Sequence, residues 1–365
     1  MTTLMKSIFK INIILVSIAL LAGCSDWTTP ESIEIEKNSI EASNPELYAK
    51  YCEALKEYKT SDHKVVYTTY DNLSDAVANG SQKISMIPDS VDFVQLMNLE
   101  VSAGQLAEMK QLKETFGTRF VVRFSLTECQ AAYEAYVEEM ETAAEEAEGE
   151  GTEGTEGEGT QTEPEIMTFE AFYAEQFQKV TAKVAEYGLD GFTFEFTGKN
   201  FDGMTPAQKE QYTAASTLVL APLKTWLAAN TKKVFFLEGN PQYVIDSEVL
   251  AAASYFILPT RDCRSVGELG YHGLNAFTSG KLPENAKLLY TVETPSFIEE
   301  EYLVGKFIVA GEYEDQIPLA ADWIAKDASF EKSGLVIWNI QRDYFNPGFS
   351  YPNVRQAIKT MNPNE

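Results

Sequence analysis

The chain has 365 residues and a formal net charge of −26, from 29 Lys and Arg against 55 Asp and Glu. A protein this acidic repels phosphate backbones, so we expect no nucleic-acid partner, whereas a neutral carbohydrate is not repelled. An apolar fraction of 44% is typical of a globular protein with a substantial core.

The N-terminus predicts a lipoprotein signal peptide over residues 1–23. A basic start precedes an apolar run over residues 11–22, which is too short to span a bilayer as a helix and ends in a lipobox before Cys24. An ordinary signal peptide that happens to contain a cysteine is the alternative. Lipidation of Cys24 would anchor the mature protein to a membrane through a tether over residues 24–43. We therefore expect a cell-envelope location, at the outer membrane and either periplasmic or on the cell surface.

Eight short apolar runs alternate with stretches of helical periodicity between residues 44 and 363. The runs are residues 64–71, 90–96, 119–124, 191–196, 234–238, 255–258, 287–292 and 334–339. The clearest helical stretches are residues 45–58, 168–187, 206–230 and 354–361. Continuous apolar strands that alternate with helices are typical of a parallel sheet. Eight of them predict an α/β fold, a (β/α)₈ TIM barrel forming a single domain over residues 44–363.

Residues 138–165 form an acidic, low-complexity insert between the third and fourth predicted strands. The insert contains twelve Glu and no Lys or Arg. Its Gly-, Glu- and Thr-rich part, residues 149–164, cannot bury apolar surface, so we expect disorder there. We interpret the insert as a tolerated expansion of a surface loop; a spacer near the barrel mouth is the alternative.

Histidine and cysteine usage argues against a metal site. The two histidines, His63 and His272, are too few for a histidine-rich site or a Ser-His-Asp triad. Cys52, Cys129 and Cys263 have wide, irregular spacing, so we expect buried small side chains with at most one disulfide bridge.

Charged and aromatic residues follow the predicted strands at their carboxyl ends, where TIM barrels place their working residues. These residues are Tyr70, Asp71, Arg123, Glu195, Glu238, Glu293 and Trp338. The fourth strand carries the most informative segment. Residues 187–195, Tyr-Gly-Leu-Asp-Gly-Phe-Thr-Phe-Glu, read as a helix end, a turn and a buried strand that ends in an acid.

This segment resembles the signature strand of glycoside hydrolase family 18, which carries the pattern Asp-Gly-x-Asp-x-Glu. Residues 87–94 and the closing segment 349–358 are also similar to lipoprotein members of that family, and Trp338 matches the tryptophan that floors its sugar subsite. The resemblance covers residues 44–363 apart from the acidic insert. It implies substrate-assisted hydrolysis, in which the strand-end glutamate is the acid and the sugar's own acetamide is the nucleophile. That mechanism needs no cofactor and no metal.

Mapped onto this sequence, the resemblance makes Glu195 the candidate general acid and Asp190 the earlier aspartate. Thr193 replaces the aspartate that orients the acetamide, although its hydroxyl could still accept an acetamide N–H. Loss of one fixed electrostatic group of this kind costs roughly 10²–10³ in rate. Residues 259–262 also lack the tyrosine that the family tends to place after strand six.

The resemblance therefore implies a protein that engages N-acetylglucosamine-containing glycans, either N-glycans or chitin-like chains, with impaired or absent hydrolysis. Tyr70, Arg123, Glu238 and Trp338 are the expected substrate-binding residues, and other glycan-uptake proteins are candidate partners. The alternatives are an active endo-β-N-acetylglucosaminidase or chitinase that uses Glu195, and a surface scaffold without sugar affinity.

Four of these residues also have purely structural interpretations. Asp190 serves equally well as a turn residue before the strand. Trp338 follows four apolar residues and fits the barrel core, and Arg123 with Glu238 fits a partly buried ion pair at the barrel mouth.

Overall fold

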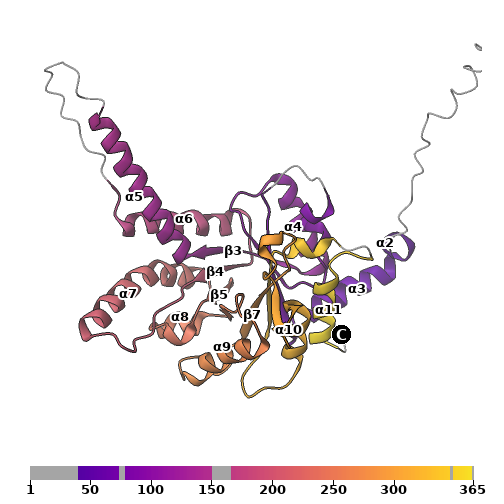
Figure 1. Ribbon diagram of the computed structural model, residues 1–365. Helices are drawn as coiled ribbons and strands as arrows, with labels where there is room; N and C mark the ends of the chain where they lie inside the picture. Colours follow the sequence, from indigo (N-terminus) through magenta and orange to yellow (C-terminus); the bar gives the residue numbers. More distant parts are fainter. Residues whose placement is uncertain (1–39, 74–78, 150–165, 346–347, 364–365) are drawn as a thin grey trace, which may run out of the picture. The chain divides into compact units, whose positions relative to one another are not determined.

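The computed structural model describes residues 40–73, 79–149, 166–345 and 348–363 (Figure 1). The chain divides into two compact units, residues 1–50 and 51–365. The first contains helix α2 (Ile40–Ser43) and the start of α3 (Pro45–Tyr58). The predicted signal peptide, Cys24 and most of the tether lie outside the described residues and stay predictions. Within the described residues, no helix is long and apolar enough to cross a membrane.

Eight parallel strands in the second unit close into a barrel, which confirms the predicted (β/α)₈ fold (Figure 1). The strands are β1 (Val65–Tyr70), β2 (Phe93–Leu96), β3 (Arg119–Ser125), β4 (Gly191–Glu195), β5 (Val234–Glu238), β6 (Tyr255–Leu258), β7 (Leu288–Glu293) and β10 (Gly334–Trp338). Their order is β1-β10-β7-β6-β5-β4-β3-β2, so the last barrel strand pairs with the first. All eight predicted strands are present; the largest difference is at β2, which begins at Phe93.

Helices surround the strands of the barrel (Figure 1). The α-helices are α4 (Ala103–Phe116), α5 (Leu126–Gly149), α6 (Phe169–Glu186), α7 (Pro206–Ala229), α8 (Ser247–Ala252), α9 (Val266–Thr278), α10 (Gln316–Ala325) and α11 (Pro352–Met361). Short 3₁₀ turns are η1 (Gly80–Gln82), η2 (Ile84–Met86), η3 (Pro241–Tyr243), η4 (Glu299–Glu301) and η5 (Ile340–Tyr344). Capping boxes start α4 at Ser102 and α7 at Thr205, which explains where these two helices begin.

Helix α5 extends into the predicted acidic insert. Residues 138–149 belong to this helix, because the Ala- and Glu-rich sequence Glu-Thr-Ala-Ala-Glu-Glu-Ala-Glu has high helix propensity. Disorder was expected from residue 149 onwards, and residues 150–165 lie outside the described residues.

The core has two layers, as period-two alternation along barrel strands requires. One layer fills the barrel interior and consists of Val65, Tyr67, Phe93, Val121, Phe236, Ile257, Leu289 and Val336. The larger layer lies between the strands and the helices and includes Phe192 and Phe194 of β4. Cys52, Cys129 and Cys263 are free and buried, as expected for small apolar side chains.

An antiparallel hairpin was not predicted. It consists of β8 (Lys306–Val309) and β9 (Glu312–Asp315), and it lies between β7 and α10. Most of its side chains are exposed, so the apolar periodicity that revealed the barrel strands is missing there.

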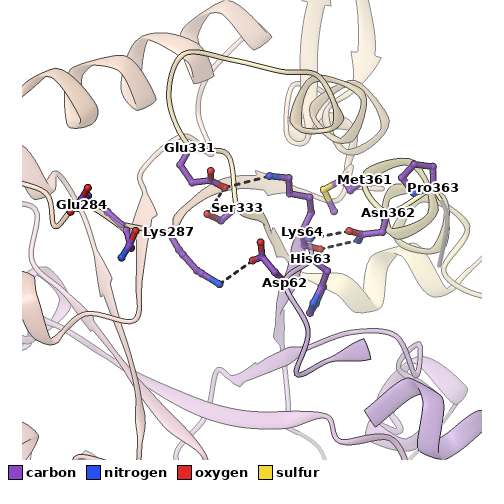
Figure 2. Close-up of a pocket in the computed structure, with 12 residues that line it drawn as sticks. Asp62, His63, Lys64, Glu284, Lys287, Glu331, Ser333, Met361, Asn362 and Pro363 are labelled. Carbon is purple, nitrogen blue, oxygen red and sulfur yellow. Dashed lines mark hydrogen bonds and ion pairs between the residues drawn. The ribbon is translucent and has the colours of Figure 1, made fainter. Parts of the chain in front are cut away.

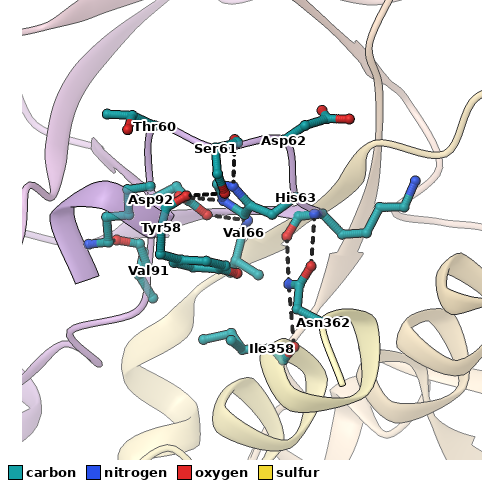
Figure 3. A network of polar contacts seen from close by, with 12 residues as sticks. Tyr58, Thr60, Ser61, Asp62, His63, Val66, Val91, Asp92, Ile358 and Asn362 are labelled. Atoms are coloured by element: carbon teal, nitrogen blue, oxygen red, sulfur yellow. Dashed lines mark hydrogen bonds and ion pairs between the residues drawn. The ribbon is translucent and has the colours of Figure 1, made fainter. Parts of the chain in front are cut away.

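Polar contacts tie together the amino-terminal end of the barrel, the end opposite the mouth. His63 Nε2 lies 2.9 Å from Asp92 Oδ1, and Asp92 Oδ2 accepts the Val66 N–H at 2.9 Å (Figure 3). Asn362, which follows α11, accepts a hydrogen bond from the Lys64 N–H and donates one to the Lys64 C=O (Figure 2).

A polar cavity of about 500 Å³ lies beside this network (Figure 2). Two ion pairs border it, Lys64–Glu331 at 3.3 Å and Lys287–Asp62 at 3.5 Å. In TIM barrels this end serves stability, and the cross-connections fit that role.

Candidate functional site

The carboxyl ends of β3, β4 and β5 bring three polar side chains into one row. Ser125, Glu195 and Glu238 are register partners across these three strands. On the other side of the mouth, Trp338 of β10 pairs with Glu293 of β7. Of the predicted site residues, the structure thus brings Arg123, Glu195, Glu238 and Trp338 to the barrel mouth.

Glu195 is enclosed by hydrogen-bond donors and is only 6% exposed. Its carboxylate accepts bonds from Ser125 Oγ at 2.8 Å, Thr197 Oγ1 at 2.6 Å, and the Thr127 N–H and Oγ1 at 3.1 and 3.2 Å. Burial acts to raise the pKa of Glu195, but the four hydrogen bonds outweigh it and hold that pKa below its ordinary value. Glu195 is therefore an ionised acceptor at neutral pH, whereas a general acid needs a raised pKa.

The three residues that enclose Glu195 were not predicted. Ser125 and Thr127 lie at the junction of β3 and α5, about seventy positions before Glu195 in the chain, and Thr197 is exposed in the loop after β4. The only sequence signal for these residues is that hydroxyl side chains occur at the ends of two neighbouring barrel strands, β3 and β4.

Thr193 lies below the mouth, inside the barrel. It is fully buried, and its Oγ1 is 2.8 Å from the hydroxyl of Tyr67, which in turn donates to Gln95 Oε1 at 2.7 Å. Interior side chains surround it, so in this structure its hydroxyl contacts Tyr67 and does not reach the mouth.

Two other predicted residues lie away from the mouth. Tyr70 is fully buried on the outer face of β1, and its hydroxyl donates to the Ser81 carbonyl at 3.0 Å. Alternation along β1 places Tyr67 inside the barrel and Tyr70 outside, so Tyr70 cannot stack on a ligand at the mouth. Asp190 precedes β4 at the opposite end, where it accepts the Phe120 N–H at 3.0 Å and pairs with Lys113. Its contacts fit the structural interpretation.

Arg123 and Glu238 form a two-pronged ion pair at the mouth. Arg123 Nε lies 2.5 Å from Glu238 Oε2 and Nη2 lies 3.2 Å from Oε1, while Nη1 binds Glu128 at 2.7 Å. Burial raises the pKa of Glu238 against the opposing charge of Arg123, and the neighbouring Glu195 charge acts in the same direction as burial. The pair fixes both side chains with little freedom to reorient.

Trp338 is half-buried, and arginines lie over its ring. The guanidinium carbon of Arg261 is 4.6 Å from a ring centroid of the indole, and that of Arg123 is 5.8 Å away. Arg261 comes from the segment where the sequence lacks the expected tyrosine. Glu293 lies 3.7 Å from Arg261 Nε. A ring-shaped ligand that stacks on the indole would therefore lie next to the Arg261 guanidinium.

The mouth thus combines an ionised carboxylate, a fixed ion pair and an indole. Carboxylates accept hydrogen bonds from hydroxyls, and an indole face packs against apolar ring surfaces. In the part of the chain that the structure describes, no group of three or more His, Cys, Asp or Glu could hold a metal ion. The arrangement is suited to holding a polar ring.

Comparison with known proteins gives a family. A family model described as glycoside hydrolase family 18, BT1044-like, matches residues 28–360. Among solved structures, a selenomethionine form of BT1044 aligns with a TM-score of 0.57 at 17% identity, over 88% of this chain and 95% of that chain. A chitinase from Bacteroides thetaiotaomicron aligns with a TM-score of 0.50 at 11% identity, over 82% and 97%. No curated protein matched. At these identities, the solved structures show a shared fold.

Proposed function

Because the chain belongs to glycoside hydrolase family 18, as a BT1044-like member, we propose that its barrel mouth binds N-acetylglucosamine-containing glycans without hydrolysing them. The family supplies the ligand class, since a chitinase is among the proteins that share the fold. The residues at the mouth are the basis for proposing binding without hydrolysis.

The observation that carries the absence of hydrolysis is the environment of Glu195. Four donors stabilise its ionised form, so the residue mapped to the general acid has no proton for a leaving group. Thr193, which replaces the acetamide-orienting aspartate, is sealed inside the barrel and bonded to Tyr67. Neither position supplies the charge or proton that substrate-assisted hydrolysis requires.

One observation favours the second candidate, an active endo-β-N-acetylglucosaminidase or chitinase. Glu195 and Glu238 are register partners, and their pKa values are moved in opposite directions. Pairs of this kind often mark acid and base assignments. The Arg123 guanidinium argues against a general-acid role for Glu238. Its two charged hydrogen bonds favour the ionised form of the Glu238 carboxyl and oppose the effect of burial on its pKa.

Binding can be tested at Trp338 by calorimetric titration with the N-acetylglucosamine tetrasaccharide. We expect Trp338→Ala to weaken binding by roughly tenfold or more, since aromatic packing contributes about 1–3 kcal/mol. Phe277→Ala is the matched control, because Phe277 is an aromatic residue 51% exposed on α9. Equal affinities for the wild type and Trp338→Ala would contradict a mouth site that uses the indole.

A further inference from the structure

A second cavity lies between the loops after β4 and β5 and helix α9, and we call it the side cleft. It has a volume of about 390 Å³ and is lined by residues 199–202 after β4, by Gln242, Tyr243 and Ile245 after β5, and by parts of residues 271–281 from α9 and the turn that follows. This volume falls within the roughly 300–1,000 Å³ that small-molecule sites occupy. None of the residues placed at the barrel mouth lines it.

The walls of the side cleft are held in place. Gly198 has a φ of +69°, and a Cβ there would lie 2.9 Å from Tyr243 Cβ, so the two loops pack without room for a side chain. Lys281 Nζ donates to the Gln242 carbonyl at 2.6 Å and joins the end of α9 to the loop after β5. Phe201 packs edge-on against Tyr212, with ring centroids 5.7 Å apart. A preformed cleft loses little entropy on binding.

Aromatic and amide side chains make up half of the lining. Tyr271 is 64% exposed, and Tyr243 and Phe201 provide two further rings. The amide oxygen of Gln242 is buried and has no hydrogen-bond partner within the described residues. A buried acceptor without a donor costs about 1–3 kcal/mol, a cost that rotation of this amide toward a ligand hydroxyl in the cleft would remove.

The charges of the cleft do not favour an anion. Lys281 already donates to a backbone carbonyl, and the carboxylate of Asp202 lies in the same cleft as Lys199. Asn275 adds a neutral amide from α9. Exposed rings beside amides suit a neutral ligand with an apolar ring face and hydroxyl groups.

We propose that the side cleft is a second carbohydrate-binding site, which takes a neutral sugar residue with its ring against Tyr271 and a hydroxyl donating to Gln242. The site is separate from the barrel mouth and does not require that the mouth binds glycans. The loop that lines it starts at Phe196, directly after Glu195.

The test uses saturation-transfer NMR on the Trp338→Ala protein with methyl glycosides of glucose, galactose, mannose, fucose, N-acetylglucosamine and N-acetylgalactosamine. The Trp338→Ala protein lacks the indole of the mouth, so its result does not depend on whether the mouth binds glycans. We expect at least one glycoside to receive saturation. Adding Tyr271→Ala or Gln242→Leu should weaken that binding roughly fivefold to tenfold.

Phe277→Ala, on the same helix but not lining the cleft, is the control and should leave the signal unchanged. Gln242 is partly exposed and Tyr271 is exposed, so we expect both variants to fold. Thermal melting verifies this before binding is compared. Two outcomes would overturn the proposal: no saturation of any glycoside with the Trp338→Ala protein, or a signal that neither Tyr271→Ala nor Gln242→Leu reduces.

Discussion

At the scale of single residues, Glu195 decides what the barrel mouth can do. Sequence reasoning placed this acid correctly at a strand end but could not give its protonation state. That state depends on hydroxyls from Ser125 and Thr127, which reach Glu195 only after β3 and β4 pair. These four donors stabilise the negative charge of the Glu195 carboxylate without a positively charged partner.

The pH dependence of stability should reveal these donors. A carboxyl with a lowered pKa stabilises the folded state above its ordinary value of 4.5, and that stability is lost as pH falls through the folded pKa. We expect Glu195→Gln to lower the unfolding free energy by about 1–3 kcal/mol at pH 7, since its amide presents N–H groups to donors. The difference should shrink at a second pH well below 4.5. Urea unfolding at both pH values measures it, and a difference independent of pH would contradict the account.

Tyr70 and Thr193 show how side-chain direction limits prediction from sequence. Both lie on barrel strands, but whether a strand residue faces the interior or the helices depends on register, which a strand-end position does not give. Tyr67 and Thr193 turned out to face each other inside the barrel. Had Tyr67 been assigned to the interior, alternation would have placed Tyr70 on the outer face.

At the scale of elements, the barrel strands were predictable because each is a continuous apolar run buried on both faces. The hairpin β8–β9 was not predictable by that rule, since its side chains are largely exposed. Helix α5 continues beyond the point where composition suggested an insert. Patterns driven by burial were thus read correctly, and segments held by local propensity were not.

Asp343 connects two elements near the end of the chain. It lies in η5 and accepts the Val354 N–H at 2.9 Å and the Asn353 side-chain amide at 3.0 Å, which joins η5 to α11. Burial raises the pKa of Asp343 from 3.8 to about 6, although these hydrogen bonds act in the opposite direction. The folded state therefore binds this proton more tightly than the unfolded state does.

The expected consequence is a gain in stability on acidification. For a carboxyl with a raised pKa, the contribution to the unfolding free energy increases as pH falls from about 6 to about 4, here by about 1–3 kcal/mol. Asp343→Asn cannot titrate and should lack this component. Comparing chemical unfolding of both proteins across that range isolates the effect, and parallel pH profiles would show that Asp343 has an ordinary pKa.

At the scale of the whole molecule, a family 18 barrel carries an aromatic and acidic mouth, and our proposal is that this mouth binds without transferring a proton. The net charge of −26 agrees with a neutral ligand. Fold and family follow from patterns spread along the chain. The state of the site follows from a few hydroxyls, and this is why the sequence predicted the barrel more completely than its mouth.

The central claim is that the mouth binds glycans without cleaving them, and one measurement tests it most directly. The mature protein is incubated with a labelled N-glycan and with the N-acetylglucosamine tetrasaccharide, and new reducing ends are quantified over days. We predict no product above the Glu195→Gln control from protein that binds the tetrasaccharide. Product formation that Glu195→Gln abolishes would contradict the account, because it would show that Glu195 donates a proton despite its four hydrogen bonds.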